Sequence, residues 1–275
     1  MSEKNATVIE SRIKDTIPVE APCLRPDTIL GKTEKEIADM TVLAGNCKTP
    51  LGELFSVRRS GDERLVVRGP LEHVKRIGQE MNGGTMIVEG DPGMHLGEKM
   101  IDGEIRVIGS LPDWCCCNMN GGLVRVEGNA GNMTAAALPG ESRGMRGGIL
   151  TVSGDTGART GDAMRRGLIA IGGNAGEFAG SRMVAGTIAV FGRLSRRAGG
   201  GMKRGSILAF GGIDELLPSF SRACRYRPVF IDIYLRRLET LGLPVDASFM
   251  RGLFTRWTGD CTSLGKGEIL QYETA

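Results

Sequence analysis

The chain has 275 residues and a formal net charge of +3, which is compatible with one large domain with appendages or at most two domains. This charge is too small to indicate a nucleic-acid-binding protein, and no apolar run approaches the roughly 18 residues that a membrane span needs. The N-terminus has no hydrophobic leader and the seven cysteines have no C-x-x-C spacing, so we expect a cytoplasmic protein with reduced thiols.

Residues 1–55 are predicted to form an N-terminal arm followed by a short helix. Pro18, Pro22 and Pro26 interrupt the apolar residues of the first thirty positions, which favours an extended arm with one short strand. Thr33 and Glu36 form a capping-box pattern that opens a helix ending near residue 40. The arm has few periodic apolar residues, so we expect it to dock on a partner and its deletion to leave the rest folded.

Residues 56–212 are predicted to form the repeat region of the chain. Two strands are expected before the first repeat methionine, over residues 55–58 and 65–68. A methionine recurs every 19 residues, with one longer interval, and glycines follow it three and nine residues later. The repeat methionines are Met81, Met100, Met119, Met145, Met164, Met183 and Met202. A fixed period near 20 with glycine punctuation is typical of a repeat architecture.

Each repeat is predicted to contribute one strand. The positions five and seven residues after each methionine are always apolar, while the position between them varies. This alternation indicates a short strand with one buried face, and 19 residues leave no room for a helix as well. We therefore expect an all-β fold, a single-stranded parallel β-helix (β-solenoid) of about seven to eight 19-residue coils, with the methionines filling its core.

Recurring glycines are expected at the corners of these coils. Three repeats contain a complete G-x-x-G-x-x-x-G unit. Its glycines are Gly90, Gly93, Gly97, Gly154, Gly157, Gly161, Gly173, Gly176 and Gly180. A phosphate-binding loop is the alternative, but no G-K-[ST] follows and no helix begins there. The glycines are therefore interpreted as structural, allowing positive φ or close approach of the next coil.

Two features interrupt the repeat. The interval from Met119 to Met145 is seven residues longer than the others, which predicts a projecting loop around residues 134–143. Cys115, Cys116 and Cys117 are adjacent in sequence and the chain has only two histidines, so we expect these thiols to hold no metal.

Residues 213–275 are predicted to form a C-terminal cap and docking segment. Residues 230–241 have the apolar spacing of an amphipathic helix, and residues 267–272 have the pattern of a strand. Phe249, Phe254, Trp257 and Tyr272 provide an aromatic richness that the repeats lack, and we expect them to divide between the cap and a partner interface. Deleting this segment should reduce solubility because the last coil would be uncapped.

Several segments together resemble the C subunit of formylmethanofuran dehydrogenase and of its bacterial relative, the formyltransferase/hydrolase complex. They are VKRIGQEMNGGTMIVEGDPGMHLGEKM, GNCKTPLGELF, SRGM and GKGEIL, besides the repeat itself. Similar coils form the C-terminal domain of the large subunit of glutamate synthase, at the end of a much longer chain. Pro112, Cys116 and Ser142 replace expected turn glycines.

The resemblance implies a right-handed β-helix in a complex that handles one-carbon units on methanofuran or its analogue. The archaeal enzyme fixes carbon dioxide with tungsten or molybdenum and iron-sulfur centres. The bacterial complex moves a formyl group from tetrahydromethanopterin to the furan cofactor and hydrolyses it to formate. In both, the chemistry belongs to the sibling A, B and D subunits, so we expect this chain to hold no catalytic residue, cofactor or metal. The excess of Arg over Lys, with 7 Cys and 13 Met, favours the bacterial complex.

Candidate contact residues are arginines near the end of the repeat. They are Arg193, Arg196, Arg197 and Arg204, joined by Arg165 and Arg166. They form either ordinary solvated surface or a contact for acidic groups, since arginine binds carboxylates in fixed geometry. By the resemblance, those groups would belong to a sibling subunit or to the glutamate-bearing tail of the furan cofactor.

Two enzyme classes on similar folds are the alternatives to a scaffold. A polysaccharide-acting β-helix enzyme needs clustered catalytic groups on one face, but the outward strand positions 106, 125, 151, 170 and 189 are Arg, Arg, Thr, Ala and Ala. A hexapeptide acyltransferase would show a six-residue apolar cadence, which is absent. The sequence therefore favours a rigid platform whose ends and inserted loop bind different siblings.

Overall fold

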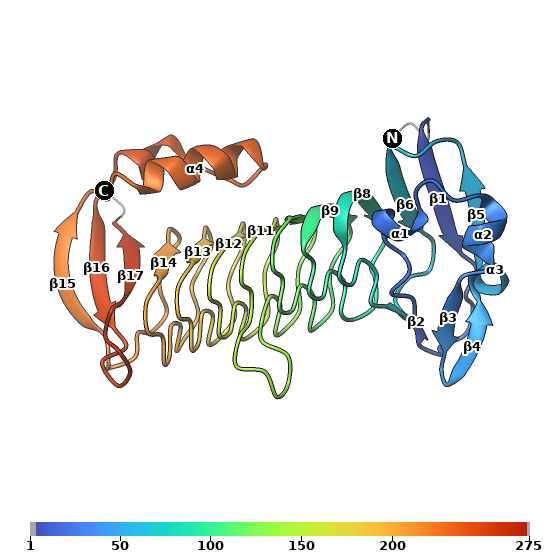
Figure 1. Cartoon of the computed structure of the whole chain (residues 1–275). Helices are drawn as coiled ribbons and strands as arrows, with labels where there is room; N and C mark the ends of the chain where they lie inside the picture. The colour runs from blue at the N-terminus through green and yellow to red at the C-terminus, as the bar shows by residue number, and fades with distance from the viewer. Residues whose placement is uncertain (1–3, 274–275) are drawn as a thin grey trace.

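The structure, a computed structural model, describes residues 4–273. The molecule is elongated, with the first strands at one end and the last strands at the other (Figure 1). A thirteen-stranded sheet runs its whole length in the order β15-β16-β17-β14-β13-β12-β11-β10-β9-β8-β6-β1-β5, and a four-stranded sheet has the order β4-β3-β2-β7. Most neighbours in the large sheet are parallel, so the predicted all-β class is confirmed.

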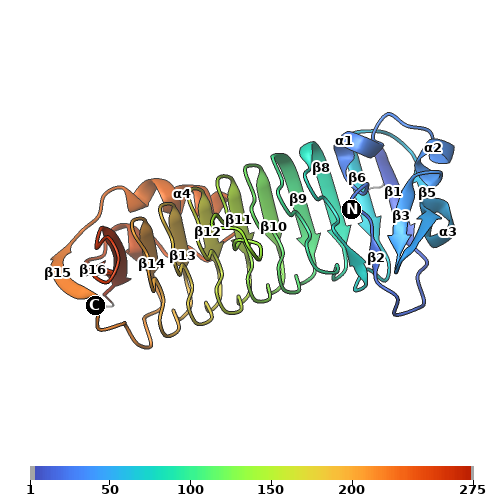
Figure 2. The same cartoon turned by 60° about the horizontal axis from the view of Figure 1, so that its bottom comes forward.

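The seven repeats each contribute one strand to the large sheet. These strands are β8 (Asn82–Glu89), β9 (Asp102–Ile108), β10 (Leu123–Val126), β11 (Ile149–Val152), β12 (Leu168–Ile171), β13 (Thr187–Val190) and β14 (Ser206–Ala209). Val124 pairs with Ile105 on one side and with Leu150 on the other, so equivalent positions of successive repeats lie side by side. Figure 2 shows the resulting stack. The strand predicted in every repeat is confirmed.

The inside of the stack is filled by the repeat methionines and the apolar strand positions. All seven methionines are completely buried, and so are Ile105, Val124, Leu150, Ile169, Ile188 and Ile207. On the return path, isolated parallel bridges join Leu111, Ala130, Thr156, Ala175, Leu194 and Ile213 in turn. The core role predicted for the methionines is confirmed, since the flexible thioether side chain packs between successive repeats.

Two glycine positions show why the repeat excludes other residues. Gly148 has φ +85, and a Cβ there would lie 2.7 Å from the carbonyl oxygen of Gly122 and from Cε of Met119. Gly192 needs no positive φ, but a Cβ would lie 2.5 Å from the carbonyl oxygen of Gly173 one repeat earlier. The two glycines thus meet different needs, left-handed backbone in one and close approach of the neighbouring repeat in the other.

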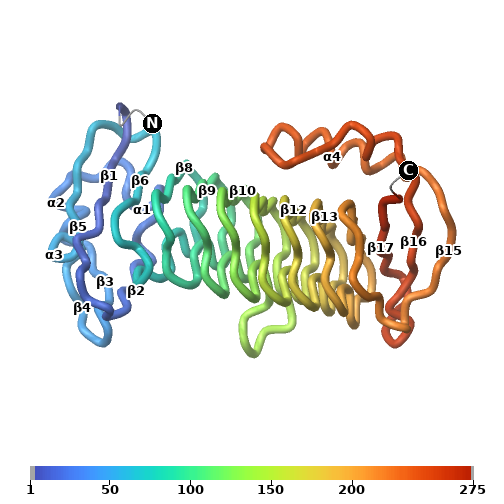
Figure 3. The backbone as a smooth tube through the Cα atoms, turned by 180° about the vertical axis from the view of Figure 1, so that it is seen from behind, coloured from blue at the N-terminus to red at the C-terminus, as the bar shows by residue number. Residues whose placement is uncertain are grey.

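The predicted loop between Met119 and Met145 projects from the stack (Figure 3). It is shorter than expected, because Thr134, Ala135, Ala136 and Ala137 are buried and only residues 138–143 stand at the surface. Small side chains let this part of the insertion pack inside the repeat.

The N-terminal end is a folded cap, and the prediction of an extended arm separate from the fold is wrong. Strand β1 (Ala6–Ser11) lies between β6 (Arg64–Arg68), with which it is parallel, and β5 (Phe55–Arg59), with which it is antiparallel. Ala6, Val8 and Ile9 are buried. A strand with partners on both sides belongs to the sheet, so this segment completes the fold.

The small sheet and three short helices complete this cap. They are β2 (Val19–Glu20), β3 (Thr41–Ala44), β4 (Cys47–Pro50), β7 (Val74–Lys75), α1 (Pro26–Ile29), α2 (Glu34–Ala38) and α3 (Leu51–Leu54). The predicted capping box opens α2: Thr33 Oγ1 accepts from the Glu36 amide at 3.3 Å, and the Thr33 amide donates to Glu36 Oε2 at 2.8 Å.

The C-terminal end is capped by three strands and two helices. They are β15 (Ser221–Tyr226), β16 (Phe254–Gly259), β17 (Gly267–Tyr272), α4 (Ile231–Thr240) and the 3-10 helix η1 (Ala247–Met250). The predicted strand over residues 267–272 is confirmed as β17. It pairs in parallel with β14 and so continues the stack by one strand.

Helix α4 lies along the outer face of the last repeats (Figures 1 and 3). Its Ile231, Leu235 and Leu238 form one apolar cluster with Ala170 and Ala189 of β12 and β13. The same cluster includes Phe210, Phe254 and Tyr272. The outward alanines of the repeat are therefore covered by the helix.

No helix among residues 4–273 combines the length and the apolar character required to span a bilayer.

Candidate functional site

Two surface columns follow the buried methionines along one edge of the stack. The residue directly after each methionine donates its amide to the carbonyl of the preceding repeat's methionine: Arg146 to Met119, Arg165 to Met145 and Lys203 to Met183, each at 2.7 Å. Since each methionine points inward, the next two residues are turned toward the surface. Equivalent side chains are thus stacked at roughly 4.8 Å intervals.

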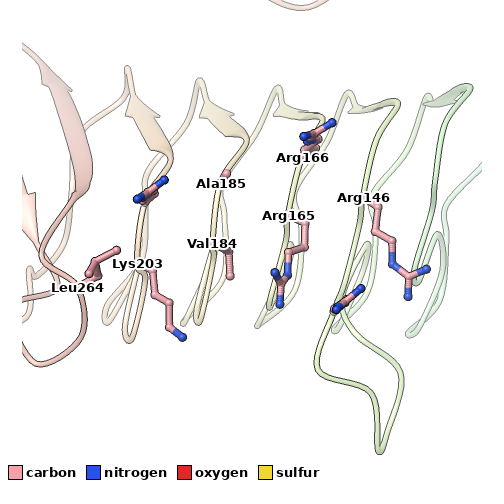
Figure 4. Close-up of a pocket in the computed structure, with 9 residues that line it drawn as sticks. Arg146, Arg165, Arg166, Val184, Ala185, Lys203 and Leu264 are labelled. Carbon is pink, nitrogen blue, oxygen red and sulfur yellow. The ribbon is translucent and has the colours of Figure 1, made fainter.

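In the last four repeats these columns form a basic groove. The groove has a volume of about 560 Å³. Its lining residues are Arg143, Arg146, Arg165, Arg166, Val184, Ala185, Lys203, Arg204 and Leu264. Figure 4 shows the cationic side chains on either side of Val184 and Ala185, with Leu264 at one end. Six cations thus surround a short apolar strip.

Most of these cations have no counter-ion in the part of the chain that the structure describes. Arg146 lies 3.5 Å from Glu141, and the other five cations form no ion pair within residues 4–273. The Nε atom of Arg165 is shielded from solvent and has no hydrogen-bond acceptor in this part of the chain. Buried polar groups normally have partners, so this nitrogen departs from the usual pattern.

The inserted loop forms one wall of the groove. Its Glu141 is held by Arg146, by Asn118 and, at 3.9 Å, by Lys99, while Asn118 Oδ1 accepts from the Leu138 amide at 2.9 Å. These contacts anchor the loop to the two preceding repeats. Arg143 at the end of the loop lines the groove together with Arg146 and Arg165.

The structure brings together only half of the predicted arginines. Arg165, Arg166 and Arg204 line the groove, whereas Arg193, Arg196 and Arg197 lie outside it. Arg193 Nε donates to Asp214 at 2.8 Å, Arg196 donates to Glu177 at 2.7 Å, and Arg197 lies 3.8 Å from Glu177. The hydrogen bond from Arg196 to Glu177 raises the pKa of the guanidinium. These three arginines already have carboxylate partners in the chain.

Sequence reasoning missed Arg143, Arg146 and Lys203. Arg146 and Lys203 occupy the same repeat position as Arg165, directly after the methionine. Aligning the repeats by that position would have found both. Arg143 carried no comparable signal, because the insertion has no equivalent in the other repeats.

The three adjacent cysteines are core residues. Cys115, Cys116 and Cys117 are completely buried, and burial raises the pKa of all three thiols, that of Cys115 to about 12. A thiol must be deprotonated to bind a metal, so this surrounding disfavours ligation. Within residues 4–273 no three His, Cys, Asp or Glu side chains gather as a metal site.

Buried carboxylates in the repeats serve as structural anchors. Glu98, 3% exposed, lies 2.9 Å from His95 Nδ1 and 3.3 Å from Arg76, which also donates to Glu20 of the N-terminal cap at 3.1 Å. Burial raises the pKa of Glu98, but the hydrogen bond from His95 and the charge of Arg76 outweigh it and lower the pKa. This network ties the cap to the first repeats.

A second buried carboxylate lies two residues before Met164. Asp162 is fully buried and accepts from Ser181 Oγ at 2.6 Å and from Arg182 Nε at 3.0 Å. Neither histidine of the chain, at positions 73 and 95, is in this group. These bonds join Asp162 to the following repeat, so the carboxylate stabilises the stack.

Comparison with known proteins finds no family model that matches the chain. Among solved structures, a chain of the formyltransferase/hydrolase complex (FhcABCD) from Methylorubrum extorquens, crystallised in complex with methylofuran, is 34% identical to this chain. The match has a TM-score of 0.90 and covers 97% of this chain and 100% of that one.

Two curated relatives match part of the chain. The C subunit of the tungsten-containing formylmethanofuran dehydrogenase 2 of Methanothermobacter marburgensis is 34% identical over 95 residues, which are 33% of this chain and 35% of that protein. The C subunit of the molybdenum-containing formylmethanofuran dehydrogenase 1 of the same organism is 41% identical over 83 residues, 30% of this chain and 21% of that protein. The chain thus matches about a third or less of the length of these relatives.

Proposed function

This chain belongs to the family of the C subunits of formylmethanofuran dehydrogenase and of the formyltransferase/hydrolase complex, and we propose that it is a non-catalytic structural subunit of a formyl-transfer complex. The observation that carries this proposal is the match over nearly the whole chain to a chain of the formyltransferase/hydrolase complex. The dehydrogenase is the second candidate, supported by the shorter matches to its C subunit.

The proposed complex converts formyl-tetrahydropterin, by way of a formyl-methanofuran analogue, to formate. Its partners would be the A, B and D subunits, which would bind methanofuran or its analogue and tetrahydromethanopterin in the cytoplasm. This chain would bind neither cofactor. The arginine-bound carboxylates and the buried thiols described above support this division of labour, because these groups are held in structural contacts or enclosed in the core.

The platform itself is proposed to be a right-handed parallel β-helix. Parallel strands joined by a return segment are almost always connected with right-handed crossovers. Equivalent positions of successive repeats pair in register twice, once in the large sheet and once in the bridges through Ala130 and Ala175. Both ladders support one turn of chain per repeat. Such a stack is rigid and suits large preformed interfaces.

The C-terminal end is the proposed docking surface for one sibling. Strand β15 pairs only with β16 and is exposed along almost its whole length. Beside it, Val229 and Ile233 are 71% and 74% exposed and Phe230 is 38% exposed. An open edge next to an apolar patch favours contact with another chain. The inserted loop at residues 138–143 is proposed to meet a different sibling.

Co-expression tests the proposed function. The chain purified alone should show no hydrolysis of a formyl-furan substrate, whereas the chain purified with the A, B and D subunits should co-elute with them in an active complex. As a matched pair of variants, Ile233→Arg should weaken co-elution, and Ile101→Arg, at an exposed position outside the C-terminal end, should not. Formate release by the isolated chain, or an active complex that assembles without it, would refute the structural role.

A further inference from the structure

We propose that an extended segment of a sibling subunit adds to strand β15 as a further strand of the large sheet and places a carboxylate side chain beside Arg222. Strand β15 is the terminal strand of that sheet and pairs only with β16. Its residues from Ser221 to Arg225 are all exposed. The inference deepens the proposed function and rests on it, because the added strand would belong to a subunit of the same complex.

The two ends of the large sheet differ in how their edges are closed. At the N-terminal end, helix α2 lies against the edge strand β5, and the Arg59 amide donates to the Glu34 carboxylate at 2.7 Å. At the C-terminal end, no further strand within residues 4–273 pairs with β15, which is the outermost strand in Figures 1 and 3. Such an edge presents unpaired N–H and C=O groups to an incoming strand. The six residues of β15 span about 20 Å, so a segment of about six residues is sufficient to cover them.

A pocket beside β15 provides a side-chain contact for the added strand. The pocket has a volume of about 480 Å³, and its lining residues are Arg222, Thr255, Trp257, Gln271, Tyr272 and Glu273. Arg222 of β15 lies directly opposite Trp257 of β16, so the guanidinium and the indole share one face of the sheet. In strand addition, backbone bonds along the edge provide affinity and a pocket of this kind provides specificity.

The charges in the pocket favour a carboxylate. Trp257 Nε1 donates to Gln271 Oε1 at 3.0 Å, and Glu273 forms an ion pair with Arg225. Arg222, in contrast, forms no ion pair within residues 4–273. A carboxylate on the added strand would bind this guanidinium in a charge-assisted pair, while its methylene groups would lie against the indole ring.

The charges of β15 disfavour a second copy of this chain as the added strand. In an antiparallel pair of two β15 strands centred between Ala223 and Cys224, Arg222 of one copy lies opposite Arg225 of the other. Like charges directly opposite each other destabilise a strand pair. A strand of different sequence that carries a carboxylate at this position replaces the repulsion by attraction, which favours a sibling subunit.

Hydrogen exchange read by mass spectrometry tests the strand addition on the isolated chain and on the assembled complex. The outward amides of β15 should exchange quickly in the isolated chain and at least about tenfold more slowly in the complex, because the added strand protects them. The amides of β14, which has partners on both sides, should exchange slowly in both samples. Unchanged exchange of β15 in an assembled complex would overturn the inference and leave the apolar patch on α4 as the contact. Protection that appears in the isolated chain as its concentration rises would identify a second copy as the occupant and overturn it as well.

A pair of charge reversals tests the pocket in the co-expressed complex. Arg222→Glu should lower the amount of sibling subunit that co-elutes with the chain by about fivefold, since it brings two carboxylates together. Arg251→Glu reverses the same charge at an exposed position of the same cap and should change co-elution by less than about twofold. Circular dichroism should show both variants folded, and Arg222→Gln offers a milder reduction if the reversal disturbs the fold.

The outcomes separate this inference from the proposed function. Equal losses in Arg222→Glu and Arg251→Glu, or no loss in either Arg222 variant, would contradict the role of the pocket. If the wild-type chain does not co-elute with the siblings at all, the proposed function fails. If the wild-type complex assembles while β15 remains unprotected, only the strand addition fails.

Discussion

Replacing Gly148 with alanine tests whether close contact between repeats, beyond backbone conformation, enforces the glycine pattern. Gly148 has φ +85, and an added Cβ would lie 2.7 Å from the Gly122 carbonyl oxygen, which is backbone and cannot rotate away. Gly140 in the projecting loop has φ +82, but a Cβ there would meet nothing within 4 Å. Alanine at either position would therefore pay the cost of a left-handed backbone conformation, but only alanine at position 148 would also clash with the neighbouring repeat.

The magnitudes follow from these geometries. A left-handed conformation costs a residue with a Cβ roughly 1–2 kcal/mol, so Gly140→Ala should lower the free energy of unfolding by about that amount. Crowding in a packed interior costs a further 1–3 kcal/mol or so, which brings Gly148→Ala to roughly 2–5 kcal/mol. The difference between the two variants isolates the contact between repeats.

Urea unfolding followed by circular dichroism measures both values, with the slope of each transition as a check that the same surface unfolds. Equal losses in the two variants would refute the reasoning, because the glycine at this position would then be required by φ alone. A larger loss in Gly140→Ala would refute it as well.

Further predictions address the core, the buried ion pairs, the N-terminal strand and the cysteines. Met164→Ala should lower the free energy of unfolding by about 2–5 kcal/mol in urea titrations, since the side chain is fully buried. The pKa of Glu98 is lower in the folded protein than its unfolded value near 4.5, so the ionised carboxylate stabilises the fold above that pH. This stabilisation is lost as the pH falls through the folded-state pKa. Glu98→Gln should therefore make the free energy of unfolding depend less on pH on the acid side of a stability-pH curve. Deleting residues 1–11 removes β1 and should leave insoluble or partly unfolded protein on size-exclusion chromatography, whereas an intact monomer would contradict its place in the sheet. Metal analysis should find no stoichiometric iron or zinc, and a metal lost in Cys116→Ser would contradict the core role of the thiols.

The sequence by itself determined the repeat, its strands and its methionine core. Each of these depends on residues within one period, such as the alternation at Val124 and Val126 or the glycine three positions after Met145. The local residue pattern is therefore sufficient to predict them. The capping box at Thr33 and helix α4 were predictable for the same reason. The period also places Arg146, Arg165 and Lys203 at one repeat position, although only Arg165 was predicted as a contact residue.

Only the tertiary structure decided the long-range pairings. Strand β1 pairs with β5 and β6, which lie about fifty residues away in the chain. Its short apolar run does not indicate which strands it pairs with, so the segment was mistaken for an arm. The alanines at 170 and 189 gave no sign that α4 covers them. Likewise, Arg193 and Arg196 form ion pairs while Arg165 and Arg166 form none within residues 4–273, and this difference depends on which carboxylates lie within 4 Å in space. Distances of this kind are set by packing, which a count of charges along the chain does not contain.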